Sequence, residues 1–205
     1  MRRITASTFV SLDGVMQVPG GKEEDTEGGF DHGGWSVGYF DDVVGQAMGE
    51  YMTPPFDLLI GRKTYEIFAG YWPGAAEGDD AEIAKPLNDA TKYVVSTTLT
   101  SVDWEPGVLI NGDVVTEIKQ LKAGDGPDIQ VHGSSVLLQT LHANNLIDWH
   151  QLVISPVVIG TGKRLFGDGT VPAGLRLVDA KIAPSGVIIA RYEPDGAIKY
   201  GQMGN

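Results

Sequence analysis

Short apolar runs alternate along the chain with segments whose apolar residues recur at helical spacing. The runs rich in β-branched and aromatic residues predict strands over residues 3–10, 58–60, 92–96, 108–110, 129–132 and 149–159. Helices are predicted from residue 41 or 42 to 51, and over 62–68, 113–122 and 134–142. Strands that alternate with helices favour an α/β fold in which a mainly parallel sheet carries helices on both faces.

The last apolar runs predict a different arrangement. Residues 175–182 and 187–192 flank a Pro-Ser-Gly turn at 184–186, a pattern typical of an antiparallel hairpin. We expect this hairpin to add antiparallel strands at one edge of the sheet. The 205 residues suffice for one sizeable core, and we find no repeat or linker that would divide the chain.

Residues 15–38 form a long glycine-rich segment without periodicity. Loops of this length are usually functional or disordered, and Phe30, Trp35 and Tyr39 argue against plain disorder. We therefore expect a lid over a site. Trp35 could stack on a planar substrate, or its indole could be buried and anchor the lid.

Two segments place a glycine at the junction between a buried strand and a helix. One strand ends at Gly61 and the other at Gly133, and each following helix opens with hydroxyl or basic residues. Such a junction directs free backbone N–H groups and the positive end of the helix dipole at one spot, and glycine allows an anion to come close. A single junction of this kind usually binds nothing. A pair in one small domain predicts a ligand with phosphate groups.

The chain is acidic, with a formal net charge of −12 at pH 7. Such a surface repels nucleic acid, which proteins bind mainly through basic patches. The acidic clusters at 22–27 and 77–82 lack periodicity, and we interpret both as solvated loops. An anionic ligand would need a local basic pocket, for which Arg62-Lys63 and Lys163-Arg164 are the candidates.

Composition disfavours several other classes of site. The chain has no cysteine, and therefore no disulfide, thiolate metal site or cysteine nucleophile. His32 has no second histidine at metal-ligand spacing, so we expect no metal. No stretch approaches the ~20 apolar residues of a membrane span, and the N-terminal apolar run is too short for a signal-peptide core. We expect a soluble cytoplasmic protein with no membrane or nucleic-acid partner.

Five segments of the chain, taken together and in order, form a pattern that none of them shows alone. They are residues 11–14, 60–65, 95–96, 132–135 and 156–166. This set resembles the dihydrofolate reductase-like family, and within it the branch of the C-terminal reductase domain of the bifunctional riboflavin-biosynthesis deaminase-reductase. The resemblance covers nearly the whole chain. It implies a single domain over residues 1–205, the three-layer dihydrofolate reductase-like fold, and a homodimer.

The resemblance also implies an NADPH site. The positions that match the family's cofactor-binding turns and strand ends are Gly61, Arg62, Lys63, Thr64, Ser96, Thr97, Gly133, Ser134, Ser135, Gly160 and Gly162. In the family, the first turn holds phosphate, the Gly133 turn faces the pyrophosphate, and the strand end at Ser96 approaches the adenosine ribose. Arg62 could pair with a ribose 2′-phosphate, the group that distinguishes NADPH from NADH. Gly160 and Gly162 would allow close backbone approach on the cofactor side.

The substrate side of the resemblance rests on one carboxylate. Asp13 matches the aspartate of the family's Ser-Leu-Asp-Gly turn, which lies beside the substrate in the riboflavin-type branch. A raised pKa would suit it as a proton donor, with water as the other source, and its alternative role is to form the turn before Gly14. Asp41, Asp42 and Glu50 are candidates for a pterin-binding carboxylate, although Asp41 and Asp42 are more simply the acids of a helix N-terminus. We interpret the remaining histidines, His132, His142 and His150, as structural.

The implied activity is reduction of a C=N or C=O bond in a small heterocycle, either a ribosylaminopyrimidine or a pterin-like molecule, with hydride from NADPH. The alternative is a module that binds NADP(H) or a phosphorylated metabolite without turnover. Deaminase activity is not expected, because the chain has neither the His-x-Glu nor the Pro-Cys-x-x-Cys signature of a zinc deaminase.

Overall fold

The computed structural model describes residues 1–203. The strands are β1 (Ile4–Ser11), β2 (Phe56–Gly61), β3 (Lys92–Val95), β4 (Gly107–Ile110), β5 (Asp128–His132), β6 (Trp149–Ser155), β7 (Leu175–Ile182) and β8 (Ile188–Pro194). The α-helices are α1 (Asp42–Tyr51), α2 (Arg62–Tyr71), α3 (Ala81–Asp89), α4 (Val114–Ala123) and α5 (Ser135–Ala143), with short 3₁₀ turns η1 (Glu27–Gly29), η2 (Val37–Tyr39) and η3 (Gly74–Glu77). Within residues 1–203, none of the helices has the length and apolar character needed to cross a bilayer.

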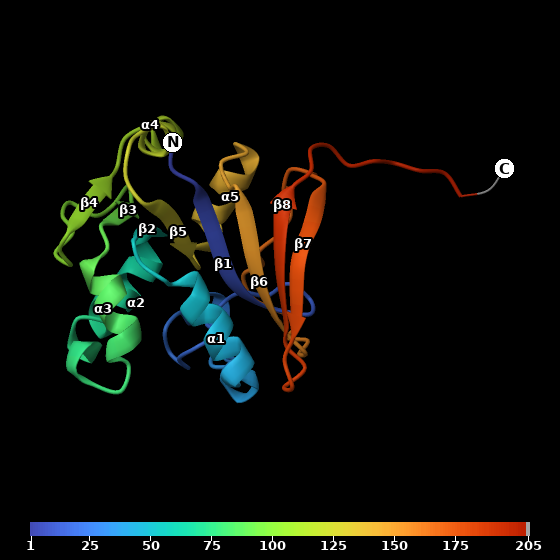
Figure 1. Cartoon of the computed structure of the whole chain (residues 1–205), viewed down its shortest axis with the longest axis horizontal. Helices are drawn as coiled ribbons and strands as arrows, with labels where there is room; N and C mark the ends of the chain where they lie inside the picture. The colour runs from blue at the N-terminus through green and yellow to red at the C-terminus, as the bar shows by residue number, and fades with distance from the viewer. Residues whose placement is uncertain (204–205) are drawn as a thin grey trace.

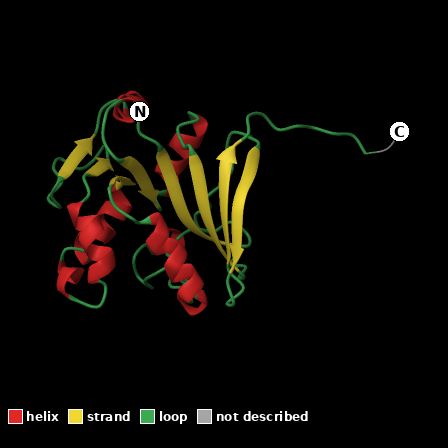
Figure 2. Cartoon of the chain, viewed as in Figure 1, coloured by secondary structure: helices red, strands yellow, loops and turns green. Residues whose placement is uncertain are grey.

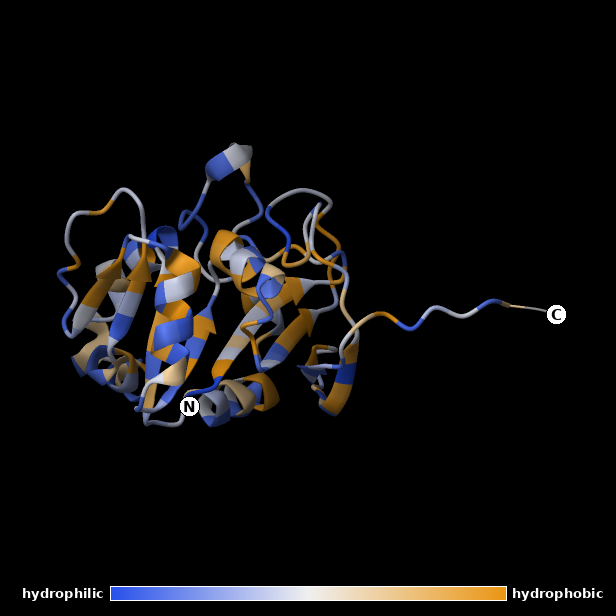
Figure 3. Cartoon of the chain, turned by 90° about the horizontal axis from the view of Figure 1, so that it is seen from above, coloured by the Kyte–Doolittle hydropathy of each residue, from blue (hydrophilic) through white to orange (hydrophobic). Residues whose placement is uncertain are grey.

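The strands form a single eight-stranded sheet in the order β4-β3-β2-β5-β1-β6-β8-β7 (Figure 1). Strands β1 to β6 pair in parallel, whereas β8 is antiparallel to β6 and β7 is antiparallel to β8. The α/β fold predicted from the sequence, with a terminal antiparallel hairpin at one edge, is therefore confirmed. After β8 the chain runs away from the body of the domain (Figure 3).

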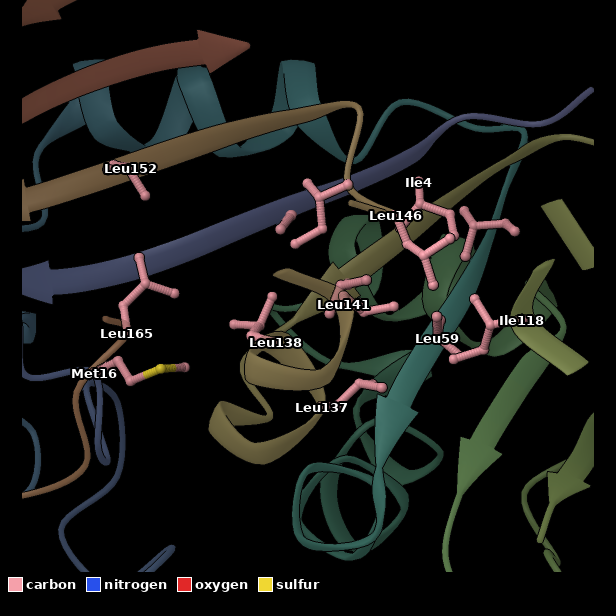
Figure 4. Packing of buried hydrophobic residues seen from close by; sticks show 14 of the residues in the cluster. Ile4, Met16, Leu59, Ile118, Leu137, Leu138, Leu141, Leu146, Leu152 and Leu165 are labelled. Atoms are coloured by element: carbon pink, nitrogen blue, oxygen red, sulfur yellow. The ribbon is translucent and has the colours of Figure 1, made fainter. Parts of the chain in front are cut away.

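Helices flank the sheet on both sides (Figure 2). On one side α4 and α5 pack against β1, β2 and β5, in a core whose fully buried members include Ile4, Leu59, Ile118, Leu138 and Leu141 (Figure 4). Because side chains alternate along a strand, Leu58 and Ile60 point to the other side and pack beneath α2 and α3. Helix α1 covers that same side farther along the sheet, where it contacts Val153 and Ile189.

One interpretation of a loop and one predicted strand end were wrong. Residues 77–82 are not simply a solvated loop, because η3 and the start of α3 lie there. Helix α3 contains Pro86, which normally signals a helix end, yet Ala84 and Leu87 are buried, and this packing holds the helical turn. Strand β6 ends at Ser155 and not at residue 159, because Pro156 has no N–H to continue the ladder.

The central strands separate at their carboxyl ends. Strand β1 pairs with β5 only as far as the Ser7–His132 partners, but it stays beside β6 as far as Ser11–Ser155. The order of the strands also reverses here, because β5 and β2 lie on one side of β1 and β6 lies on the other. In open α/β sheets, ligands bind in the crevice that such a reversal opens.

The lid, which we define as residues 15–38, is fastened to the segment around Lys163. The N–H of Met16 donates to the Lys163 carbonyl at 2.8 Å. Val15, Val18 and Phe30 form a small buried cluster with Trp35, whose indole N–H donates to the Gln17 carbonyl at 2.8 Å. Trp35 therefore has the anchoring role that was the alternative to substrate stacking.

An ion-pair cluster inside the lid corrects the interpretation of residues 22–27 as a solvated loop. The Asp25 carboxylate is buried and accepts from Lys163 Nζ at 2.7 Å, and the exposed Glu27 carboxylate accepts from the same ammonium at 2.5 Å. The Gln17 amide donates to the carbonyls of Asp25 and Glu27. Lys163 is thus neutralised within the protein and is not the free basic group that the sequence suggested.

Gly162 is enclosed by the lid. Its φ is +107°, and a Cβ atom built there would lie 2.7 Å from Cε2 of the buried Phe30 ring. Gly160 also has a positive φ, of +86°, but nothing lies within 4 Å of a Cβ at that position. A side chain at residue 160 would therefore cause backbone strain alone, whereas one at residue 162 would cause both strain and crowding.

Gly162→Ala should destabilise the protein more than Gly160→Ala. The backbone strain common to both costs about 1–2 kcal/mol, and displacement of Phe30 adds about 1–3 kcal/mol for Gly162 alone. Urea unfolding of both variants measures the difference. Equal losses of stability would show that the lid does not press on Gly162.

Candidate functional site

A cavity of about 910 Å³ opens where β1 and β5 separate. Its walls come from the carboxyl ends of these strands, from the lid, from one face of α2 and from the turn that connects β5 to α5. Met48 of α1 also lines it. Residues of the lid therefore line a cavity, and its role as the cover of a site stays a prediction.

Three α-helices, α2, α3 and α5, begin near this cavity without a side-chain cap; α3 begins at the acidic Asp80, whereas α2 and α5 begin at the glycine turns. The N-cap residues of α2 and α5, Gly61 and Ser134, make no side-chain capping bond. By contrast, Asp41 caps α1 by accepting from the N–H groups of Val43 and Val44, and an aspartate caps α4 in the same way. The open N–H groups and positive dipole ends of α2 and α5 remain available to an anion. Asp41 has the helix-capping role that was its simpler interpretation.

The two glycine turns touch each other through one hydroxyl. Ser134 Oγ accepts from the Gly61 N–H at 2.8 Å and donates to Thr64 Oγ1 at 2.8 Å, although Gly61 and Ser134 are 73 residues apart in the sequence. Ser134 adopts a left-handed conformation with φ +64°, and Gly133 before it has φ +62°. A Cβ atom at Gly133 would lie 3.3 Å from Thr64 Oγ1, so the turns fit closely. The structure thus brings both predicted turns into one unit, with Lys63, Thr64, Gly133, Ser134 and Ser135 on the cavity wall.

The other predicted cofactor residues lie beside this unit. Strand β3 neighbours β2, so Ser96 and Thr97 follow the strand end next to the Gly61 turn. The Ser96 hydroxyl is buried and accepts from the N–H groups of Thr98 and Leu99, whereas Thr97 is exposed. Arg62 is exposed and pairs with Glu66 at 3.1 Å. Contact of these residues with an adenosine ribose stays a prediction.

Asp13 lies outside the residues that line the cavity. Its carboxylate accepts from Ser11 Oγ at 2.6 Å, from the Gly160 N–H at 2.8 Å and from the Ile159 N–H at 3.1 Å. The Ser11 bond and these backbone donors lower the pKa of Asp13 to about 2. This shift is opposite to the one a proton donor needs. The geometry therefore favours its alternative, turn-forming role.

Gly160 and Gly162 belong to the same supporting structure. Gly160 holds the Asp13 carboxylate and Gly162 packs under Phe30, and neither lines the cavity. Their expected place beside a cofactor is not supported, because both glycines adopt a positive φ and make their contacts within the protein.

The floor of the cavity is polar where a parallel sheet is normally apolar on both faces. Thr5, Ser7, Gln130 and His132 point from the central strands β1 and β5 towards α1. Thr5 Oγ1 lies 3.0 Å from the Tyr51 hydroxyl, and the Gln130 amide donates to the Tyr51 carbonyl at 2.6 Å. The sequence analysis did not identify these residues as part of a site. The available signal was the polar positions within β5, Gln130 and His132, just before the Gly133 turn.

Ser7 and His132 are the members of this floor that line the cavity. Since the Gln130 amide nitrogen faces a carbonyl, its Oε1 atom must accept from His132 Nε2, which lies at 3.1 Å. Nδ1 of His132 is then the unprotonated nitrogen. Burial lowers the pKa of His132 to about 4, so the imidazole is neutral at pH 7. The interpretation of His132 as purely structural misses this cavity-facing acceptor.

Aromatic side chains form the apolar wall of the cavity. Phe9 stacks with Phe40 at a centroid distance of 6.4 Å, and Phe68 meets Trp72 edge to face at 6.0 Å. Such surfaces favour flat ligands. Thr8, the neighbour of Phe9 in β1, also lines the cavity, but its Oγ1 atom is buried and has no hydrogen-bond partner in residues 1–203.

Comparison with known proteins shows similarity along nearly the whole chain. YyaP of Bacillus subtilis (strain 168), an uncharacterised protein, is 29% identical over 196 residues, which are 95% of this chain and 96% of YyaP. The crystal structure of a candidate riboflavin biosynthesis protein from Shewanella sp. PV-4 superposes with a TM-score of 0.71 at 21% identity, covering 94% of this chain and 99% of the other.

Enterococcus faecalis dihydrofolate reductase complexed with NADP(H) has a TM-score of 0.58 at 14% identity, covering 94% of this chain and 96% of that enzyme. At these identities the two solved structures show a common dihydrofolate reductase-like fold. A family model described as the RibD C-terminal domain matches residues 2–189. The chain belongs to the RibD C-terminal domain family.

Proposed function

We propose that the protein is an NADPH-dependent reductase that transfers hydride to a C=N or C=O bond of a small heterocycle. The observation that carries this proposal is the pair of uncapped helix N-termini, joined by Ser134, at the edge of an aromatic cavity. Membership of a reductase family supports it, as does the NADP(H) bound to the structurally similar dihydrofolate reductase.

The donor groups of this site fit the phosphates of a dinucleotide. The N–H groups at the starts of α2 and α5, together with the Lys63 ammonium, would bind the pyrophosphate. The pair between Arg62 and Glu66 is exposed and contributes little, so the guanidinium is available to a ribose 2′-phosphate. NADPH, when bound, supplies the hydride, while the protein supplies position and a dry pocket.

The side chains around the cavity define what the protein contributes to the reaction. The aromatic wall would orient a flat ring, and the anchored lid would limit access of water. Because Asp13 is ionised at neutral pH, we assign the proton that balances the hydride to water.

We also propose that the protein forms a homodimer through β7. This strand is at the edge of the sheet, and all eight of its residues are exposed. Leu177 and Ile182 leave 51% and 76% of their surface uncovered. Long apolar edge strands are usually covered by another chain or element. A second copy of β7 would cover this one.

Sedimentation velocity tests the dimer. The unmodified protein should sediment as a dimer, and Ile182→Lys should produce a monomer, because a lysine on an edge strand opposes pairing. The matched control is Val108→Lys, which changes an exposed residue of β4 at the opposite edge. A monomeric unmodified protein, or a dimer that both variants retain, would contradict the proposal.

Tryptophan fluorescence tests the cofactor, since Trp72 lines the cavity. NADPH should bind at least about tenfold more tightly than NADH, a difference of about 1.4 kcal/mol. Arg62→Gln should remove most of this preference. Arg3→Gln is the control, because it changes an exposed arginine that pairs with Asp128 and does not line the cavity.

Turnover is followed by loss of NADPH absorbance with pterins and ribosylaminopyrimidines as oxidants. Tight NADPH binding with no oxidation by any of them would favour the alternative, a module that binds NADP(H) without turnover. Failure to bind either dinucleotide would contradict the reductase proposal.

A further inference from the structure

The imidazole of His132 offers the cavity a fixed hydrogen-bond acceptor. Its Nε2–H group donates to Gln130 Oε1, and the amide N–H of Gln130 donates to the Tyr51 carbonyl. Nδ1 has no partner within residues 1–203 and is not sealed off by protein atoms, so it opens on the cavity that the ring lines. A neutral nitrogen acceptor of this kind is matched by an N–H or O–H donor of a ligand.

The surroundings of His132 favour a flat partner. The Phe68 ring lies 6.3 Å from the imidazole, and the Tyr51 ring meets the imidazole edge to face at 5.4 Å. Because Tyr51 and Phe68 fix the plane of the imidazole, the direction of the Nδ1 lone pair is fixed as well. A ring seated on the aromatic wall can therefore be oriented by a single N–H group.

The charges around the cavity disfavour an anionic substrate. Three carboxylates line it, those of Glu24, Asp25 and Asp80, and of these Asp25 is paired with Lys163, which leaves Glu24 and Asp80 to oppose an anion. Of the two lining lysines, Lys163 is already paired with Asp25 and Glu27. Lys63 lies at the start of α2, where the proposed function assigns it to the dinucleotide. A phosphate ester on the substrate would thus face carboxylates without a free cation.

We propose that the substrate is an uncharged, flat heterocycle with a ring N–H group, which donates a hydrogen bond to Nδ1 of His132. This inference rests on the proposed function and narrows its substrate class. Of the two substrate classes that the resemblance implies, it favours a pterin-like molecule over a phosphorylated ribosylaminopyrimidine, because a phosphate would face the carboxylates of Glu24 and Asp80. His132 is then a specificity-determining residue.

Calorimetric titration in the presence of NADP⁺ tests the N–H contact, because the oxidised dinucleotide prevents turnover. The probes are lumazine and 1,3-dimethyllumazine, at pH 6.5, where His132 is neutral. Lumazine should bind at least about tenfold more tightly than the dimethyl compound, which has no ring N–H. His132→Leu should weaken lumazine by a similar factor and leave the dimethyl compound unchanged.

A conservative variant separates the contact from a merely structural role. In His132→Asn the amide oxygen can take the place of Nδ1, so lumazine affinity should return towards that of the unmodified protein. NADP⁺ affinity should be the same in all three proteins, which checks that the variants fold. Equal affinities for the two lumazines, or a failure of both to bind, would overturn the inference.

A second pair of probes tests the charge argument. Neopterin should bind at least about tenfold more tightly than neopterin 3′-monophosphate, and added salt should reduce the difference. Equal or tighter binding of the phosphate would overturn the inference. Absence of NADP⁺ binding to the unmodified protein would overturn the proposed function as well, whereas NADP⁺ binding without discrimination between probes would overturn this inference alone.

Discussion

The hydroxyl of Ser134 is the contact on which the site depends. By accepting from the Gly61 N–H and donating to Thr64, it joins the starts of α2 and α5. Each helix start alone is an ordinary strand-to-helix junction. Because the hydroxyl holds them together, N–H groups from two helices face the same volume, and their partial positive charges add at one point. The left-handed backbone at Ser134 is part of this arrangement, since it turns the side chain towards Gly61.

The rest of the site forms where two strands of the sheet stop pairing. Strand β1 stops pairing with β5 after Ser7, and the freed edge becomes the wall of the cavity. The polar side chains of Thr5, Gln130 and His132 lie under this wall. Thr5 and Gln130 form hydrogen bonds with Tyr51 of α1, and Gln130 in turn bonds with His132. The other face of the same strands, with Ile4 and Ile129, is a fully apolar core. The central strands β1 and β5 thus carry apolar side chains on one face and polar side chains on the other, although that second face is apolar again on either side, under α2 and α3 and under α1.

Features that depend on neighbouring residues in the sequence could be predicted. The Asp41 cap, the two glycine turns and the terminal hairpin each follow from local backbone chemistry, and the structure has all of them. Features that depend on distant partners could not. The bond from Ser11 that lowers the pKa of Asp13 is local. Two further donors to Asp13, however, are N–H groups 146 and 147 residues away, and the pairing of Lys163 with Asp25 joins residues 138 apart. Neither is visible in a local pattern.

The same limit applies to His132 and α3. The tautomer of His132 is set by Gln130 on the same strand and ultimately by the Tyr51 carbonyl on a helix 79 residues away from that glutamine. Helix α3 is held despite Pro86 by burial of Ala84 and Leu87, a tertiary effect that outweighs local propensity. The family resemblance supplied the fold and the cofactor turns, but its carboxylate at Asp13 carried a role that the local hydrogen bonds oppose.

The way in which the lid is fastened limits how a ligand can reach the cavity. The lid is tied to the Lys163 segment by backbone bonds on Met16 and by ion pairs on Asp25 and Glu27, so it cannot swing out as a free flap without breaking several contacts at once. Val37, at the end of the lid, and Phe40, just after it, line the cavity with side chains that are 59% and 51% exposed. Rotation of these two side chains is a far smaller movement. Access to the cavity at this end therefore depends on side chains that change rotamer within picoseconds to nanoseconds, whereas the fastened part of the lid holds its place.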